Sequence, residues 1–146
     1  MVVRYHGAED FIRDLALFDE VMGDWRRYRE TVSLRQLLEN RDTRNMVLYS
    51  MLITFQSVMR CSHHVIIKNY LPKPGTYEET FLILRKAGLL ESSFADKLAG
   101  LVSYRQALVN SPQAVDLREI YEVLSNDLQV LELYRVKLEA LMKDEE

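Results

Sequence analysis

Residues 44–60 read RNMVLYSMLITFQSVMR, and no charged residue lies between the two arginines that end this stretch. Leu48, Leu52 and Phe55 follow one another at steps of four and three, which is the spacing of one face of a helix. Further valines and methionines widen the apolar surface, so other elements have to enclose this helix. Its polar residues argue against a membrane span. The sequence therefore predicts a central helix of a soluble bundle, over about residues 42–70.

Apolar periodicity and turn residues predict further helices on both sides of the central one. An amphipathic helix is expected over residues 8–30, with Gly23 as a point where it bends or ends. A short helical turn then leads into the central helix. The segment LPKPG at residues 71–75 ends the central helix, because its prolines and glycine exclude helical pairing.

Three helices are expected after residue 75, and no strand. The last of them is predicted to run without a break through Leu141. The fold is therefore predicted to be all-α, a four-helix up-and-down bundle with an additional short helix. The residues expected to begin helices by capping are Ser33 with Gln36, Thr76 with Glu79, Ser92 or Ser93, and Asp116 with Glu119.

Length and composition are those of an ordinary globular protein. A chain of 146 residues that is 48% hydrophobic and 28% charged predicts a single domain over residues 1–146. No targeting or stop-transfer segment is visible, so a cytoplasmic location is expected. Cys61 is the single cysteine and lies in the central helix, which favours a reduced core thiol.

Charge is unevenly distributed along the chain. The net charge of −3 argues against a protein that coats nucleic acid in general. Residues 24–44 contain six arginines and four acids, whereas residues 116–146 contain nine acids and four bases. The run WRRYR at residues 25–29 offers aromatic and basic groups that can stack on and neutralise RNA. The alternative is a solvated helix face.

Arg105 is the candidate functional residue that the periodicity itself singles out. It takes a position in an apolar seam that includes Leu98, Leu101 and Leu108. A guanidinium in a seam is costly unless it is paired or faces a groove that binds an anion. Pairing with an acid of a neighbouring helix and extension of the charged end to solvent are the structural alternatives.

A metal site is not expected. His63 and His64 are adjacent, so they diverge around a helix and lack the spacing of a helical metal-binding pair. His6 is far away in the sequence. No glycine-rich phosphate loop or nucleophile triad is found, and no cofactor is predicted.

Three segments resemble the HepT-like family of HEPN-superfamily ribonucleases, which serve as toxins of toxin–antitoxin pairs. They are YLPKPGTYEETF at residues 70–81, LRKAGLL at 84–90 and LVSYRQALV at 101–109. Residues 115–124 fit the family's final helix, and the resemblance spans about residues 42–140. It implies a homodimer with a shared cleft, an RNA substrate, and an antitoxin of the nucleotidyltransferase type that attaches AMP to a motif tyrosine.

The family's motif is Arg, four residues, His, one residue and Tyr. Arg105 matches the arginine, and Gln106 stands where asparagine is usual. Asn110 holds the histidine position and Pro112 the tyrosine position. Arg105 and Asn110 are therefore the predicted catalytic positions, and Asn110 is expected to approach the phosphate that Arg105 holds. The asparagine amide cannot move the proton that histidine moves.

Four more residues belong to the predicted motif neighbourhood. Gln56 and Arg60 lie where the family tends to carry an acid, His64 corresponds to a helix histidine, and Tyr104 precedes the motif arginine. The sequence thus predicts a HepT-like protein that binds RNA or protein and has weak or lost ribonuclease activity. One alternative is an active metal-independent ribonuclease toxin that uses Tyr104 or His64. Another is a non-enzymatic helical interaction scaffold.

Overall fold

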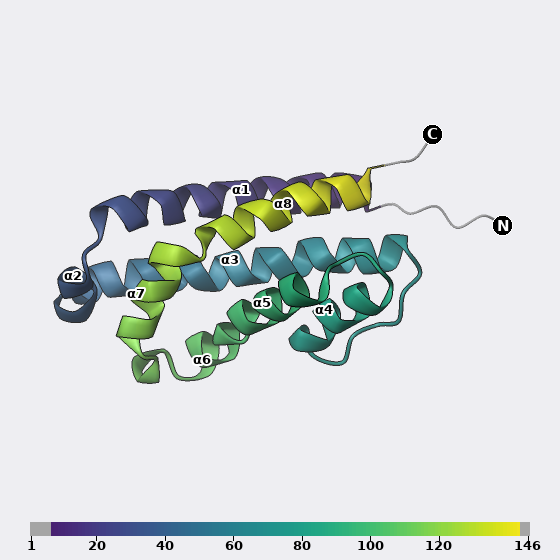
Figure 1. Ribbon diagram of the computed structural model, residues 1–146. Coiled ribbons are helices and arrows are strands. Elements are labelled where there is room, and N and C mark those ends of the chain that lie inside the picture. The colour runs from purple at the N-terminus through teal and green to yellow at the C-terminus, as the bar shows by residue number, and fades with distance from the viewer. Residues whose placement is uncertain (1–6, 144–146) are drawn as a thin grey trace.

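A computed structural model describes residues 7–143, and within this range the fold is an all-α bundle, as predicted (Figure 1). Helices α1 and α8 lie side by side over one side of α3, while α4, α5 and α6 cover the other side. In chain order the elements are α1 (Ala8–Thr31), α2 (Leu34–Glu39), α3 (Arg41–Lys68), α4 (Tyr77–Lys86), α5 (Ser92–Val102), α6 (Tyr104–Asn110), the 3₁₀ turn η1 (Pro112–Ala114), α7 (Leu117–Asn126) and α8 (Leu128–Met142).

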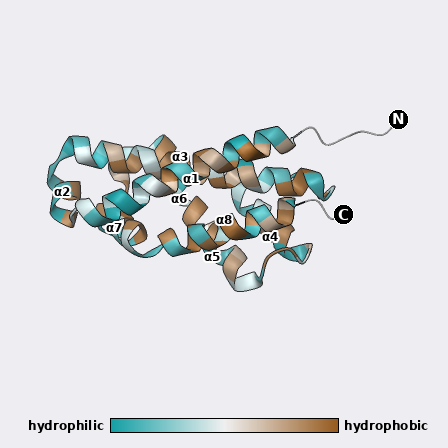
Figure 2. Ribbon diagram, turned by 90° about the horizontal axis from the view of Figure 1, so that it is seen from above, coloured by the Kyte–Doolittle hydropathy of each residue, from teal (hydrophilic) through white to brown (hydrophobic). Residues whose placement is uncertain are grey.

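Helix α3 is the central element, which confirms the prediction made from its apolar sequence. Val47, Met51, Phe55 and Val58 are fully buried on it. It contacts helices on both of its sides, including α1, α4, α6 and α8. Hydrophobic and hydrophilic residues alternate along the surrounding helices, as amphipathic helices around a shared core require (Figure 2). No helix within residues 7–143 is both long and apolar enough to cross a membrane.

Two buried hydrogen bonds join the helices across the core. The indole Nε1 of Trp25 donates to Thr54 Oγ1 at 2.7 Å, which links α1 to α3. The Ser62 hydroxyl donates to the Val58 carbonyl at 2.7 Å, so the Tyr134 hydroxyl of α8 donates to Ser62 Oγ at 2.6 Å. These bonds satisfy polar groups that would be costly to bury alone.

The predicted helix starts are mostly confirmed. Ser33 and Gln36 form the expected capping box. Asp116 caps α7, and Thr76 Oγ1 accepts from the Glu79 amide at 3.2 Å. The capping box expected at Thr76 is only half formed, because the Glu79 carboxylate accepts from the Gly75 amide at 2.7 Å and not from the Thr76 amide. The capping role of Ser92 or Ser93 was wrong, because the N-cap of α5 is Glu91, without a side-chain hydrogen bond.

Two predicted helices are broken in the structure. The helix expected to follow Ser92 is divided at Ser103, whose hydroxyl donates to the Gly100 carbonyl at 2.5 Å in competition with the helical pattern. The last helix is divided between Asn126 and Leu128, where Asn and Asp follow each other and favour helix ends. The stretch around Gly23, in contrast, stays helical within α1.

The aromatic residues of the WRRYR run are not available to RNA. Trp25 is fully buried and Tyr28 is 8% exposed, so neither ring can stack on a base. The three arginines of the run remain exposed. The interpretation of this run as an RNA-stacking surface is therefore wrong, because α1 turns its aromatic residues toward α3.

Candidate functional site

A hollow of about 520 Å³ opens beside Arg105, and three parts of the chain form it. Helix α3 contributes one residue near its C-terminal end, the loop before α4 and the first turn of α4 contribute several, and the α5–α6 junction closes it. The residues that line this hollow, here called the Arg105 hollow, are His63, Pro74, Gly75, Thr76, Tyr77, Glu78, Val102, Ser103, Arg105 and Gln106.

Arg105 is held over an aromatic ring and not by an acid. Its Cζ lies 4.2 Å from the centroid of the Tyr77 ring, a cation–π contact. Its Nε is shielded from solvent and has no hydrogen-bond partner. Within residues 7–143 Arg105 forms no ion pair, so the alternative of pairing with a neighbouring acid does not hold. The guanidinium is positioned to accept an anionic ligand.

The predicted motif positions are only partly brought together within one chain. Gln106 lines the Arg105 hollow, whereas Asn110 and Pro112 do not. Asn110 is the exposed last residue of α6, and Pro112 is the exposed first residue of η1. Asn110 lies five positions after Arg105 in α6, a rotation of about 140° around the axis. The two side chains therefore lie on different sides of α6, and Asn110 does not line the Arg105 hollow of its own chain.

The environment of Tyr104 prevents its phenol from acting as a general base. Its hydroxyl donates to Glu119 Oε1. Burial, together with this hydrogen bond to a carboxylate, raises the pKa of Tyr104 to about 12. The phenol therefore stays protonated at neutral pH and cannot act as a general base there.

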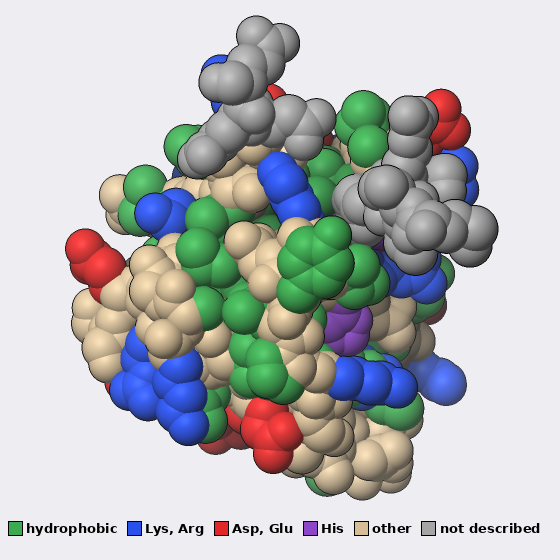
Figure 3. Space-filling model, turned by 90° about the vertical axis from the view of Figure 1, so that its right-hand side faces the viewer, with side chains coloured by type: hydrophobic (Ala, Val, Ile, Leu, Met, Phe, Trp, Pro, Cys, Tyr) green, Lys and Arg blue, Asp and Glu red, His purple; other side chains and the backbone are tan. Residues whose placement is uncertain are grey.

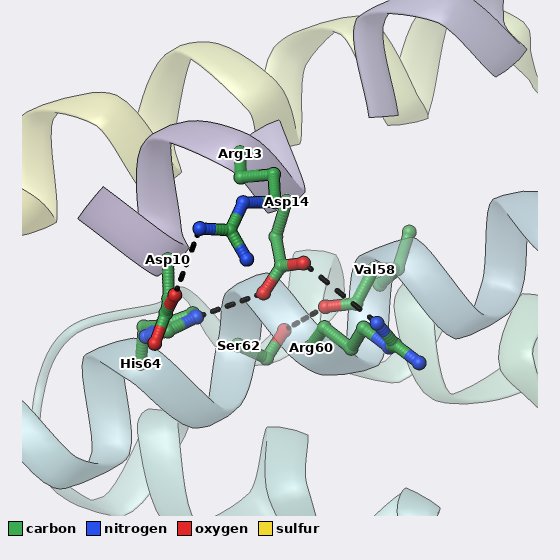
Figure 4. A network of polar contacts seen from close by, with 7 residues as sticks. All are labelled: Asp10, Arg13, Asp14, Val58, Arg60, Ser62 and His64. Carbon is green, nitrogen blue, oxygen red and sulfur yellow. Dashed lines mark hydrogen bonds and ion pairs between the residues drawn. The ribbon is translucent and has the colours of Figure 1, made fainter. Parts of the chain in front are cut away.

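His64 and Arg60 belong to a polar network between α1 and α3 (Figure 4). His64 Nε2 lies 2.9 Å from Asp14 Oδ2, and Arg60 Nη1 lies 3.9 Å from Asp14 Oδ1. The His64 ring also contacts Phe11 edge to face, at 5.6 Å between centroids. This network lies on the α1 side of α3, and neither residue lines the Arg105 hollow, nor does the half-buried Gln56.

His63 is the histidine that lies in the Arg105 hollow, and the sequence analysis did not select it. Burial lowers the pKa of His63 below its ordinary value of 6.5, and the nearby His64 and Lys73 lower it further. The imidazole is therefore neutral at pH 7 and can accept a proton. The sequence contained one signal for this: adjacent helix residues point in different directions, so His63 and His64 cannot both face α1.

Cys61 and the histidines provide no other reactive centre. Cys61 is fully buried, and burial raises the pKa of its thiol to about 12. It is therefore a core thiol and not a nucleophile. Among residues 7–143, no three His, Cys, Asp or Glu side chains are arranged to hold a metal ion. His6 lies outside this range.

The lowered pKa of His63 predicts a specific dependence of stability on pH. Below about pH 6.5 the unfolded chain takes up a proton that folded His63 resists, so the free energy of unfolding decreases as the pH falls. Urea unfolding at pH 7.5 and 5.5 measures this loss. The variant His63→Gln is expected to lose less stability over the same interval. Equal losses in the two proteins would contradict the assignment.

Solved structures with the same fold include chains of toxin–antitoxin complexes. A chain of a toxin–antitoxin complex with AMP-PNP is 17% identical with a TM-score of 0.81, and the match covers 89% of this chain and 97% of that chain. The tri-AMPylated HEPN toxin of Shewanella oneidensis in complex with MNT antitoxin gives 17% identity, a TM-score of 0.80, and coverage of 89% and 96%. YutE of Bacillus subtilis, a cytosolic protein of unknown function, gives 14%, 0.77, and coverage of 90% and 87%.

No curated protein sequence matches this chain. The structural matches share too little sequence to show more than the fold. The sequence model of one family, however, covers the central helix, the Arg105 hollow and all the degenerate motif positions. That model, Ribonuclease HepT-like, matches residues 18–138, and the chain therefore belongs to the HepT-like ribonuclease family.

Proposed function

We propose that this protein is the toxin-derived component of a toxin–antitoxin pair, and that it binds RNA through Arg105 with weak or lost cleavage activity. The observation that carries the proposal is the guanidinium of Arg105, which faces a hollow without an acid partner. Arginine binds phosphate with several parallel N–H donors, and its charge does not depend on pH in the physiological range.

Loss of cleavage follows from the residues at the motif positions. Metal-independent RNA cleavage needs a group that takes the 2′-hydroxyl proton and one that protonates the leaving oxygen. The Asn110 amide does neither near neutral pH. A second candidate, residual cleavage, is favoured by the position of His63 in the Arg105 hollow, where a neutral imidazole can accept a proton.

Assembly and partners form part of the same proposal. A homodimer brings a second α6 to the site, and the exposed Val109 and Asn110 give α6 a surface for such a contact. The structural similarity to complexes with MNT antitoxin supports a nucleotidyltransferase-type partner. Pro112 has no hydroxyl, so AMP transfer to that position is not possible. A cytoplasmic location agrees with an RNA ligand.

Replacing Arg105 by alanine is expected to weaken RNA binding by about tenfold to a hundredfold, because a hydrogen bond to a charged group contributes about 1.5–3 kcal/mol. The dependence of the binding constant on salt concentration should also become weaker, by the amount that one phosphate contact contributes. Arg105→Lys should give an intermediate affinity, since it keeps the charge but not the planar donor array. Fluorescence anisotropy with a labelled single-stranded RNA measures both effects.

Arg35→Ala is the matched control, because Arg35 is an exposed arginine of α2 that pairs with its helix neighbour Glu39 at 3.1 Å. Cleavage is followed with the same RNA on a denaturing gel. If Arg105→Ala and Arg35→Ala bind RNA as tightly as the wild-type protein, Arg105 is not the phosphate-binding residue. Robust cleavage by the wild-type protein that Arg105→Ala abolishes would replace the proposal by an active ribonuclease.

A further inference from the structure

A second, smaller hollow of about 310 Å³ adjoins the Arg105 hollow at the C-terminal end of α3. Its lining is His63, Ile66, Ile67, Leu71, Lys73 and Pro74. His63 and Pro74 line both hollows, so the two lie next to each other, and together they are here called the trough. Figure 3 faces this end of the molecule and shows hydrophobic side chains and a histidine between groups of lysine and arginine.

The two halves of the trough differ in chemistry. The Arg105 hollow is lined by the Arg105 guanidinium, the Gln106 side chain and Thr76, whose hydroxyl caps α4. It also contains one opposing charge, the Glu78 carboxylate. Arg105 lines this hollow and forms no ion pair within residues 7–143, although its Nε is itself shielded from solvent. An anion in the hollow can accept from the other N–H groups of the guanidinium.

The smaller hollow is mainly aliphatic. Ile67 is 58% exposed in the last turn of α3, although the residue beside it, Ile66, is almost fully buried. Leu71 is partly buried and packs against the core from the adjoining loop. Lys73 adds a positive charge at the rim. A flat apolar group can therefore pack against Ile67 and Leu71 while it stays near the Lys73 ammonium group.

We infer that the trough binds one nucleotide of single-stranded RNA, with its phosphate at Arg105 and its base against Ile67 and Leu71. The inference rests on the proposed function, because it takes RNA as the ligand and specifies how the RNA is held. The two volumes match the range of about 300–1,000 Å³ that is usual for small-molecule sites. A base in a duplex is stacked and paired, so only an unpaired nucleotide can enter.

The test compares three small probes by isothermal titration calorimetry: inorganic phosphate, uridine and uridine 3′-monophosphate. The trough predicts that the nucleotide binds at least about tenfold more tightly than phosphate, because base burial adds to the phosphate contact. Ile67→Ser should weaken binding of the nucleotide about fivefold and leave phosphate binding unchanged. Val136→Ser is the matched control, since Val136 is a 64% exposed aliphatic residue of α8.

A variant that is expected to bind more tightly tests the Arg105 hollow, because misfolding cannot explain a gain in affinity. Glu78→Gln removes the opposing carboxylate and is expected to tighten binding of both phosphate and the nucleotide by several fold. Equal affinities for phosphate and the nucleotide, together with no effect of Ile67→Ser, would overturn the trough and leave a simple anion site.

Binding of single-stranded RNA separates this inference from the proposed function. If wild-type protein binds the RNA and Ile67→Ser binds it as tightly as Val136→Ser does, the trough is refuted and the proposed function stands. If wild-type protein binds neither RNA nor the nucleotide, both are refuted. Preference for a duplex over a single strand of the same sequence would also contradict the trough.

Discussion

Replacing Asn110 by histidine is expected to raise the rate of RNA cleavage by about 10²–10⁴-fold, the usual contribution of one general acid–base group. Asn110 is exposed at the end of α6, so the larger ring meets no packed core. The imidazole points away from the Arg105 of its own chain. The gain therefore requires a second protomer that places its Arg105 near this histidine. Initial rates on a labelled single-stranded RNA measure the change.

Three variants separate the proton-transfer group from the turn that follows it. Asn110→Gln keeps an amide and should show no gain. Asn110→His with Pro112→Tyr restores both motif residues, but it removes the proline that fixes η1, so its melting temperature has to be compared with the parent. If the histidine variants fold and dimerise by light scattering but do not cleave RNA, the loss extends beyond the motif. Gln56 and Arg60 are then the next positions to change.

Replacing Trp25 by alanine is expected to lower the free energy of unfolding by about 3–5 kcal/mol, the usual cost of deleting a large buried aromatic side chain. Trp25 is fully buried, and its ring packs edge to face on Phe55 at 6.2 Å. The substitution leaves a cavity between α1 and α3 and also removes the donor to Thr54. Urea unfolding followed by circular dichroism measures the loss.

A double-mutant cycle separates the hydrogen bond of Trp25 from its packing. Trp25→Phe keeps most of the ring but leaves Thr54 Oγ1 without its donor, which is expected to cost about 1–3 kcal/mol. Thr54→Val in the same chain removes the hydroxyl oxygen that has lost its donor, together with its own bond to the Ser50 carbonyl at 2.8 Å, so the double variant should recover part of that loss. A Trp25→Ala protein as stable as the wild-type would show that the α1–α3 contact does not determine stability.

The sequence predicted the central part of the fold well because local chemistry determines it. The charge-free stretch between Arg44 and Arg60 has to be enclosed, and α3 is the enclosed helix. Caps such as that of Ser33 depend on residues three positions apart, which a sequence shows directly. The break at Ser103 was missed because a serine in an apolar repeat is compatible with an unbroken helix. Its hydroxyl bond to Gly100 is visible only in the structure.

The candidate site was predicted less completely because it depends on how helices face one another. The apolar period placed Arg105 in a seam, and the structure puts it over Tyr77, a residue of another helix that no local pattern indicated. His63 and His64 are equivalent as adjacent helix residues. Only the packing of α1 on one side of α3 decides that His64 meets Asp14 and His63 faces the Arg105 hollow.

The hydrogen bond between Tyr134 and Ser62 joins residues 72 positions apart in the chain. During synthesis, α1 and α3 can pair before α8 has been made, and α8 then packs beside α1 on the same side of α3. Tyr134 also contacts the rings of Phe81 and Phe94, which belong to the helices beside the Arg105 hollow. A nascent chain therefore cannot complete the packing behind the Arg105 hollow until α8 has been translated, so the hollow takes its final form only after every element that lines it has been made.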